Sequence, residues 1–150
     1  MMTAIAPPFL EIFRGRRDGY RALLELSHRQ QTLIEADDYT ELLAVLGRKQ
    51  VLLSRLEDVN RRYPDLREQW QASRSALPAE HRSTCEHLLA ETEHCLAELL
   101  LVEQSSTESL TTRRDATQHE LQAIARGSQA HEAYRDHLAP VTHRHLDIGQ

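Results

Sequence analysis

Histidines and cysteines are the side chains whose spacing in this sequence could hold a metal ion. The chain contains nine histidines and two cysteines. His81 and Cys85 stand four positions apart, so on a helix they would share one face within reach of the same ion. His87 and His94 stand seven positions apart, but no HExxH segment or CxxC pair completes a set of ligands. We therefore expect no metal centre and no cofactor, and a zinc-binding regulator is kept only as a further alternative.

The two cysteines suit the core of a helical protein better than they suit catalysis. Cys85 and Cys95 would lie about 15 Å apart on one helix, far beyond the reach of a disulfide. Both fall at apolar positions of a heptad pattern, where a thiol behaves as a small hydrophobe. The nearby carboxylates Glu86 and Glu91 disfavour the thiolate that a catalytic cysteine needs. No Ser-His-Asp arrangement, glycine-rich phosphate loop or pair of carboxylates stands out, so we expect no enzyme.

The composition of the 150-residue chain predicts a helical, cytoplasmic protein. Apolar residues make up 40%, charged residues 27% and aromatic residues 5%, with five glycines and five prolines. Leucine outnumbers the β-branched apolar residues, which favours helices over sheets. The net charge of −5 leaves no basic footprint for nucleic acid. No apolar run approaches the roughly 18 residues of a membrane span, and the first residues lack the basic start of a signal peptide.

Two long helices are predicted in the first 63 residues. A pair of prolines precedes a heptad pattern over 9–35, as expected at the start of a helix. Asp38 and Glu41 have the spacing of a capping box, which would begin a second helix over 38–63. The connection is about three residues long, so we expect an antiparallel hairpin. The seam of the second helix that is expected to face the core consists of Tyr39, Leu42, Leu46, Leu53, Leu56 and Tyr63.

A proline ends this hairpin, and the remaining sequence predicts a short helix over 65–76 and a long one over 78–126. The three long helices have matched lengths of about 40 Å over their shared part. This pattern favours an all-α fold, a three-helix up-down-up antiparallel bundle of coiled-coil type with an extended third helix. A Gly-Ser pair after residue 126 predicts a helix stop. We therefore expect a bundle domain over 1–126 and a flexible amphipathic C-terminal tail over 127–150.

The apolar side chains of the second half exceed what such a bundle needs for its core. Four consecutive apolar residues end at Val102, and a tract rich in serine and threonine follows. An apolar surplus of this kind is typical of a protein that binds a helix of a partner. The candidate contact residues are Leu99, Val102, Leu110, Leu121, Ile124, Tyr134 and Leu138. An alternative stays open, in which residues 103–150 fold back and cover the chain's own bundle.

One segment resembles the flagellar export chaperones of the FlgN type: LLELSHRQQTLIEADDYTELLAVLGRKQVLLSRLEDVNRRY, from Leu23 to Tyr63. In that family a first helix leads through a short acidic connector into a second helix that carries a Leu-Leu pair and a Lys-Gln or Lys-Glu step. Here the connector is Ala36-Asp37-Asp38-Tyr39, the pair is Leu42-Leu43 and the step is Lys49-Gln50. Lys49 is the only lysine of the chain.

The resemblance implies a cytoplasmic chaperone of type III protein export. Such chaperones bind the C-terminal helical regions of hook–filament junction proteins, keep them unassembled during flagellum assembly and deliver them to the export apparatus. The resemblance places substrate binding in the C-terminal part of the chain. Chaperones of the FliT type have similar helical hairpins, so both types stay open. The alternative function is a self-associating coiled-coil adaptor, for instance a homodimer, because it would need the same apolar surplus.

Overall fold

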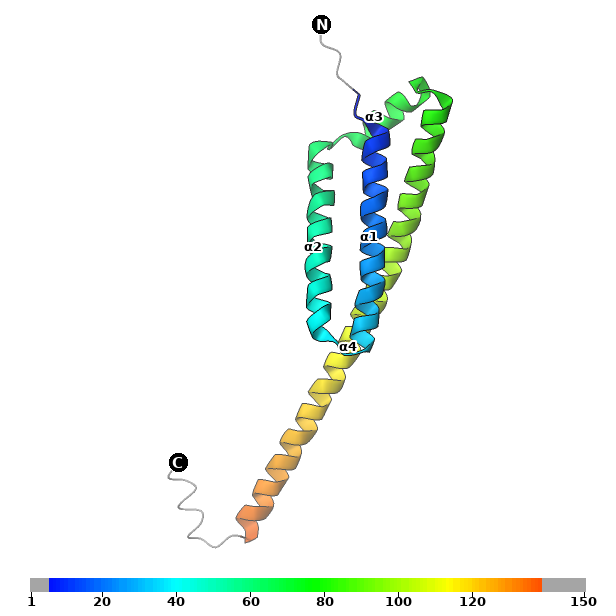
Figure 1. The fold of residues 1–150 in the computed structure, drawn as a ribbon. Helices are drawn as coiled ribbons and strands as arrows, with labels where there is room; N and C mark the ends of the chain where they lie inside the picture. The colour runs from blue at the N-terminus through cyan, green and yellow to red at the C-terminus, as the bar shows by residue number, and fades with distance from the viewer. Residues whose placement is uncertain (1–5, 139–150) are drawn as a thin grey trace. The chain divides into compact units, whose positions relative to one another are not determined.

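The computed structural model describes residues 6–138, with side chains described as far as residue 135. Within that range the chain is helical, which confirms the all-α prediction at this level. The elements are α1 (Phe9–Glu35), α2 (Tyr39–Arg62), α3 (Leu66–Ser73), the 3₁₀ turn η1 (Arg74–Ala76) and α4 (Ala79–Leu138) (Figure 1). The chain divides into two compact units, residues 1–109 and residues 110–150.

The connection between α1 and α2 follows the chemistry predicted for it. Asp37 takes a left-handed conformation with φ of 56°, which aspartate tolerates better than most residues. The carboxylate of Asp38 then accepts a hydrogen bond from the backbone N–H of Glu41 at 3.2 Å. This bond satisfies one of the free N–H groups of the first turn, so the predicted cap of α2 is confirmed.

α1 and α2 pack against each other in opposite directions. Close to their connection, Ile34 and Val45 are fully buried in one apolar cluster. Farther from it, a Cβ atom added at Gly19 would come within 3.0 Å of a methyl carbon of Leu56. A glycine at this point allows the two helices to approach closely.

The seam of α2 predicted to face the core is confirmed at Leu42 and Leu56, which are buried, and wrong at three other positions. Its residues Tyr39, Leu46 and Leu53 are 47%, 41% and 40% exposed. Val45, which lies beside that seam, is completely buried and belongs to the same apolar cluster as Leu42. A heptad seam is fully buried only when neighbouring helices cover it from both sides, and α2 packs against α1 on one side (Figure 1). The buried face is therefore turned toward Val45, and one edge of the apolar surface is left in solvent.

A second apolar cluster lies at the opposite end of α1, where the short helix α3 joins the first unit. Trp70 of α3 makes edge contacts with Phe9 and Phe13, with ring centres 5.3 and 5.2 Å apart. Cys85 and Leu88 of α4 are buried in the same cluster. Aromatic pairs of this geometry add stability beyond the apolar area they bury. The prediction that the two cysteines are core residues is confirmed, since Cys95 is also buried and both thiols are free.

Within the first unit, α4 also contacts α1 along its length. Arg17 lies 3.3 Å from Glu91, and the hydroxyl of Ser27 donates a hydrogen bond to Glu103 at 2.6 Å. The residue numbers of the two partners increase together. Along these contacts, α1 and this part of α4 therefore run in the same direction (Figure 1).

α4 is longer than predicted, because it continues for 60 residues to Leu138. The Gly-Ser pair at residues 127 and 128 does not end it. Glycine within a helix costs only about 1 kcal/mol relative to alanine, and the residues around the pair are mostly good helix formers. The first part of the expected C-terminal tail is thus helical, and residues 139–150 lie outside the described part of the chain.

Candidate functional site

The chain's single lysine lies in a buried polar cluster formed by three helices. Lys49 of α2 is only 9% exposed. Its ammonium group donates to the side-chain oxygen of Gln30 on α1 at 2.6 Å, and it forms an ion pair with Glu103 on α4. Glu103 also accepts the hydroxyl hydrogen bond from Ser27, which has no exposed surface. We call Ser27, Gln30, Lys49 and Glu103 the polar cluster.

The carboxyl group of Glu103 is held in its charged form by these neighbours. Burial alone would raise its pKa. The hydrogen bonds from Lys49 and Ser27, together with the charge of Lys49, outweigh burial and hold the pKa below its ordinary value. The cluster therefore contains an ion pair between Lys49 and Glu103. The attraction between the two charges offsets the cost of partly removing them from water.

The polar cluster joins the α1–α2 hairpin to α4. Removing one member would leave a charge or a polar atom without its partner, which is costly in a buried position. Sequence signals for this cluster exist, since Ser27 and Gln30 interrupt an apolar heptad face and Lys49 is the lone lysine. The contacts that these residues make with Glu103 could not be predicted from the sequence, because they depend on how α4 is aligned with α1.

Further polar side chains follow the polar cluster along α4, toward the end of the first unit. The amide of Gln31 donates to the hydroxyl of Ser105 at 2.8 Å. Ser106 is 1% exposed, and its hydroxyl has no hydrogen-bond partner among the described residues. The serines of this tract thus lie partly inside the first unit, where the sequence predicts only a hydrophilic stretch.

The predicted contact residues fall into both units. Leu99 and Val102 are half-buried in the first unit. In the second unit, Leu121, Ile124 and Tyr134 are exposed by 61%, 67% and 65%, and Leu110 is exposed as well. Leu138 is the last residue of α4, and its side chain lies outside the described part.

Helical geometry places Leu110, Leu121, Ile124 and Tyr134 on two faces of α4. At about 100° per residue, Leu110, Leu121 and Ile124 fall on one face of α4. Tyr134 falls on a neighbouring face. An apolar stripe formed by Leu110, Leu121 and Ile124 is the arrangement that a partner helix could cover.

Sequence reasoning missed an exposed apolar stripe on α2, because it assigned part of that stripe to the core. Its members follow a spacing of four, three and seven residues along one side of the helix: Tyr39, Leu43, Leu46 and Leu53. Leu43 is the most exposed of them, at 71%. On α4, Leu100 and Leu101 are exposed too, as expected from the apolar run that ends at Val102. We call the four residues of α2 the α2 stripe.

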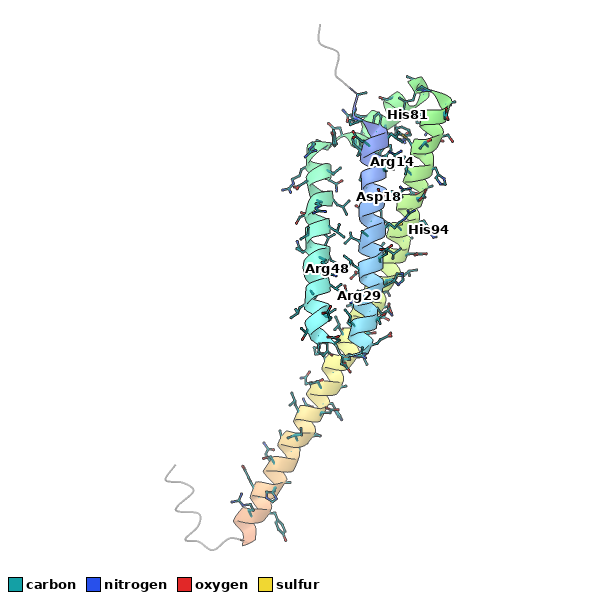
Figure 2. All side chains as sticks on the ribbon, in the orientation of Figure 1. Arg14, Asp18, Arg29, Arg48, His81 and His94 are labelled. Atoms are coloured by element: carbon teal, nitrogen blue, oxygen red, sulfur yellow. The ribbon has the colours of Figure 1, made fainter. Side chains whose placement is uncertain are left out.

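The histidines do not form a metal site in the part of the chain that the structure describes. Figure 2 shows His81 and His94 at separate levels of α4. Among the described residues, no three histidine, cysteine or carboxylate side chains come together as a group that could hold a metal ion. Burial, with Glu86 nearby, raises the pKa of the Cys85 thiol, so this group is a poor nucleophile at neutral pH.

No protein-family model, curated protein or solved structure matches this chain. The resemblance to flagellar export chaperones therefore depends on the sequence motif alone. Over the described residues, none of the helices has both the length and the apolar character needed to cross a membrane.

Proposed function

We propose that this chain is a non-catalytic binding protein for amphipathic helices, and specifically a cytoplasmic type III export chaperone of the FlgN type. Its partners would be the C-terminal helical regions of hook–filament junction proteins, with the export apparatus as a further contact. In this proposal α1, α2 and the first part of α4 form an up-down-up bundle. The second part of α4 presents the binding residues.

The observation that carries the proposal is the set of large apolar side chains exposed on α4 beyond residue 109. Leu121 and Ile124 are each more than 60% exposed and lie three residues apart. Helical neighbours of this kind can insert together into the apolar face of another helix. Exposed apolar patches in a soluble protein commonly mark interaction sites. The motif from Leu23 to Tyr63 supports the flagellar assignment.

The test mixes the purified chain with a purified C-terminal helical region of a hook–filament junction protein. Size-exclusion chromatography with light scattering should show a complex. The double variant Leu121→Asp with Ile124→Asp should lose it, because two carboxylates would be buried in an apolar interface. Its far-UV circular dichroism and melting temperature should stay close to those of the wild type, since both side chains are exposed.

A matched control places the same charges on another face of the same helix segment. The double variant Gln122→Asp with Gln129→Asp should keep the complex. Unfolding of the Leu121 and Ile124 variant would show that these residues are part of a core. Loss of the complex in both double variants would indicate a general charge effect rather than a binding face.

A second function, self-association, is favoured by the α2 stripe. The stripe has the spacing of a coiled-coil contact, and a second copy of the chain could cover it. In this case the chain would be an adaptor that acts as a homodimer, and the dimer would exist without any flagellar partner.

A further inference from the structure

A pocket of about 790 Å³ in the first unit is not used by either proposed function. It lies where the end of α2, the helix α3 and one face of α4 meet α1. Its apolar wall includes Phe13, Tyr63, Trp70, Leu89 and Leu96. The volume lies in the range of ordinary small-molecule sites, which hold ligands by an apolar surface and a few placed polar groups.

The polar groups of this pocket include two arginines, Arg16 and Arg67, that form no ion pair within residues 6–135. Arg16 of α1 has its Nε atom buried, and no described residue accepts a hydrogen bond from it. Arg67 of α3 forms no ion pair with any described residue. Arg74 is paired with Glu86 at 3.3 Å, which leaves Glu93 as the one other carboxylate of the lining. With three arginines and two glutamates, the lining is therefore cationic overall.

We propose that this pocket binds a carboxylate carried next to an aromatic or branched apolar group. Trp70, Phe13 and the leucines of α4 would hold the apolar group. Arg16 and Arg67 would hold the carboxylate by charge-assisted hydrogen bonds. Two sources have this chemistry: a free aromatic acid, and an acidic residue beside an apolar one in a protein partner.

The chain offers a direct readout of occupancy, because Trp70 is its only tryptophan and lines the pocket. Tryptophan emission would be followed during titration with phenylpropionate and with its neutral amide, phenylpropionamide. We expect a saturable change with the acid and an affinity at least about tenfold lower for the amide, since a charge-assisted hydrogen bond is lost. An equal affinity for both compounds would overturn the proposal.

A second arm of the experiment distinguishes the two sources. It uses an alanine-based helical peptide with phenylalanine and glutamate four residues apart, and the same peptide with glutamine in place of glutamate. Saturation by phenylpropionate assigns the pocket to free acids, and saturation by the glutamate peptide alone assigns it to a protein segment. No saturable change with either probe would overturn the proposal.

Variants of the lining residues test whether the change in tryptophan emission comes from binding in this pocket. Arg16→Met should lower the affinity of the bound probe at least about tenfold. Arg67→Met should act in the same direction and serves as a second variant if Arg16→Met does not fold. Arg14→Met, on the same helix but outside the pocket lining, should leave the affinity unchanged (Figure 2). Unchanged affinity in both Arg16→Met and Arg67→Met would overturn the proposal, and it would leave the function proposed for residues 110–138 intact.

Discussion

Lys49 and Glu103 illustrate how much a single pair of residues can specify in a helical protein. Each lies on a different helix, and Gln30 and Ser27 of a third helix complete their hydrogen bonds. A partly buried ion pair of this kind contributes little net stability, because removing charges from water costs about as much as their attraction returns. The ion pair instead affects how the helices are aligned, since a charged group in an apolar interface is stable only where it meets its partner. The polar cluster therefore favours one alignment of α4 on the hairpin over slipped alternatives.

The first prediction concerns the two charges of the polar cluster. Lys49→Met should lower the free energy of unfolding by about 1–3 kcal/mol, because Glu103 loses its cation while it stays partly buried. The double variant Lys49→Met with Glu103→Met should recover most of that loss, since no unpaired charge remains. Urea unfolding followed by circular dichroism measures both effects. A double variant as unstable as the sum of the single variants would show that the two residues do not interact.

The pH dependence of stability follows from the lowered pKa of Glu103. A carboxyl group with a lower pKa in the folded state contributes stability above its unfolded pKa and loses it as the pH falls through the folded pKa. The free energy of unfolding should therefore fall below about pH 4.3, the ordinary pKa of a glutamate. Glu103→Gln removes this contribution, so the stability difference from the wild type should shrink as the pH is lowered from 7 to 3. Two parallel curves over that range would contradict the assignment.

At the scale of elements, the two faces of α2 explain why helix boundaries are easier to predict than helix orientations. The start of α2 is determined by local chemistry at Asp38 and Glu41, which the sequence displays directly. The rotation of α2 depends on which neighbours cover it. Because α1 covers it mainly from one side, Val45 is buried and the α2 stripe is exposed. An apolar pattern indicates which face of a helix can be buried. It does not specify which helix or partner buries that face.

The glycines of α1 give a prediction at this scale. Gly15→Ala should raise the free energy of unfolding by about 0.5–1 kcal/mol, because a Cβ atom there meets nothing within 4 Å and alanine is the better helix former. Gly19→Ala should lack this gain, since its Cβ would lie 3.0 Å from a Leu56 methyl carbon. Thermal unfolding of the two single variants measures the difference. Equal stabilisation by both would show that α2 yields at Leu56 without cost.

At the scale of the whole molecule, the composition predicts the helical class, and the positions of the prolines predict most helix boundaries. α1 begins and ends where the heptad pattern does, and the predicted short helix is divided between α3 and η1. The polar cluster could not be predicted, because Ser27, Lys49 and Glu103 are far apart in sequence and meet only through the packing of three helices. The end of α4 could not be predicted either, since one glycine is too weak a signal against a run of helix-forming residues.

Self-association gives a prediction for the whole molecule. If the α2 stripe forms a homodimer, light scattering should give a mass that rises with concentration toward twice the 17.3 kDa of the chain. Leu43→Glu with Leu53→Glu should then restore the mass of a single chain. A constant mass of about 17 kDa across concentrations would instead leave the α2 stripe uncovered in the isolated protein and disfavour the adaptor function.

Because the only lysine is buried, the rate at which it is chemically modified can report how often the packed helices separate. An amine-reactive reagent needs access to the ε-amino group, and that of Lys49 is enclosed by Gln30 and Glu103. Modification at this single position would therefore proceed through transient separation of the helices, at a rate set by how often they part. Since the sequence has a single lysine and such reagents leave arginine alone, the fraction of chains modified at Lys49 would report the fraction that has opened.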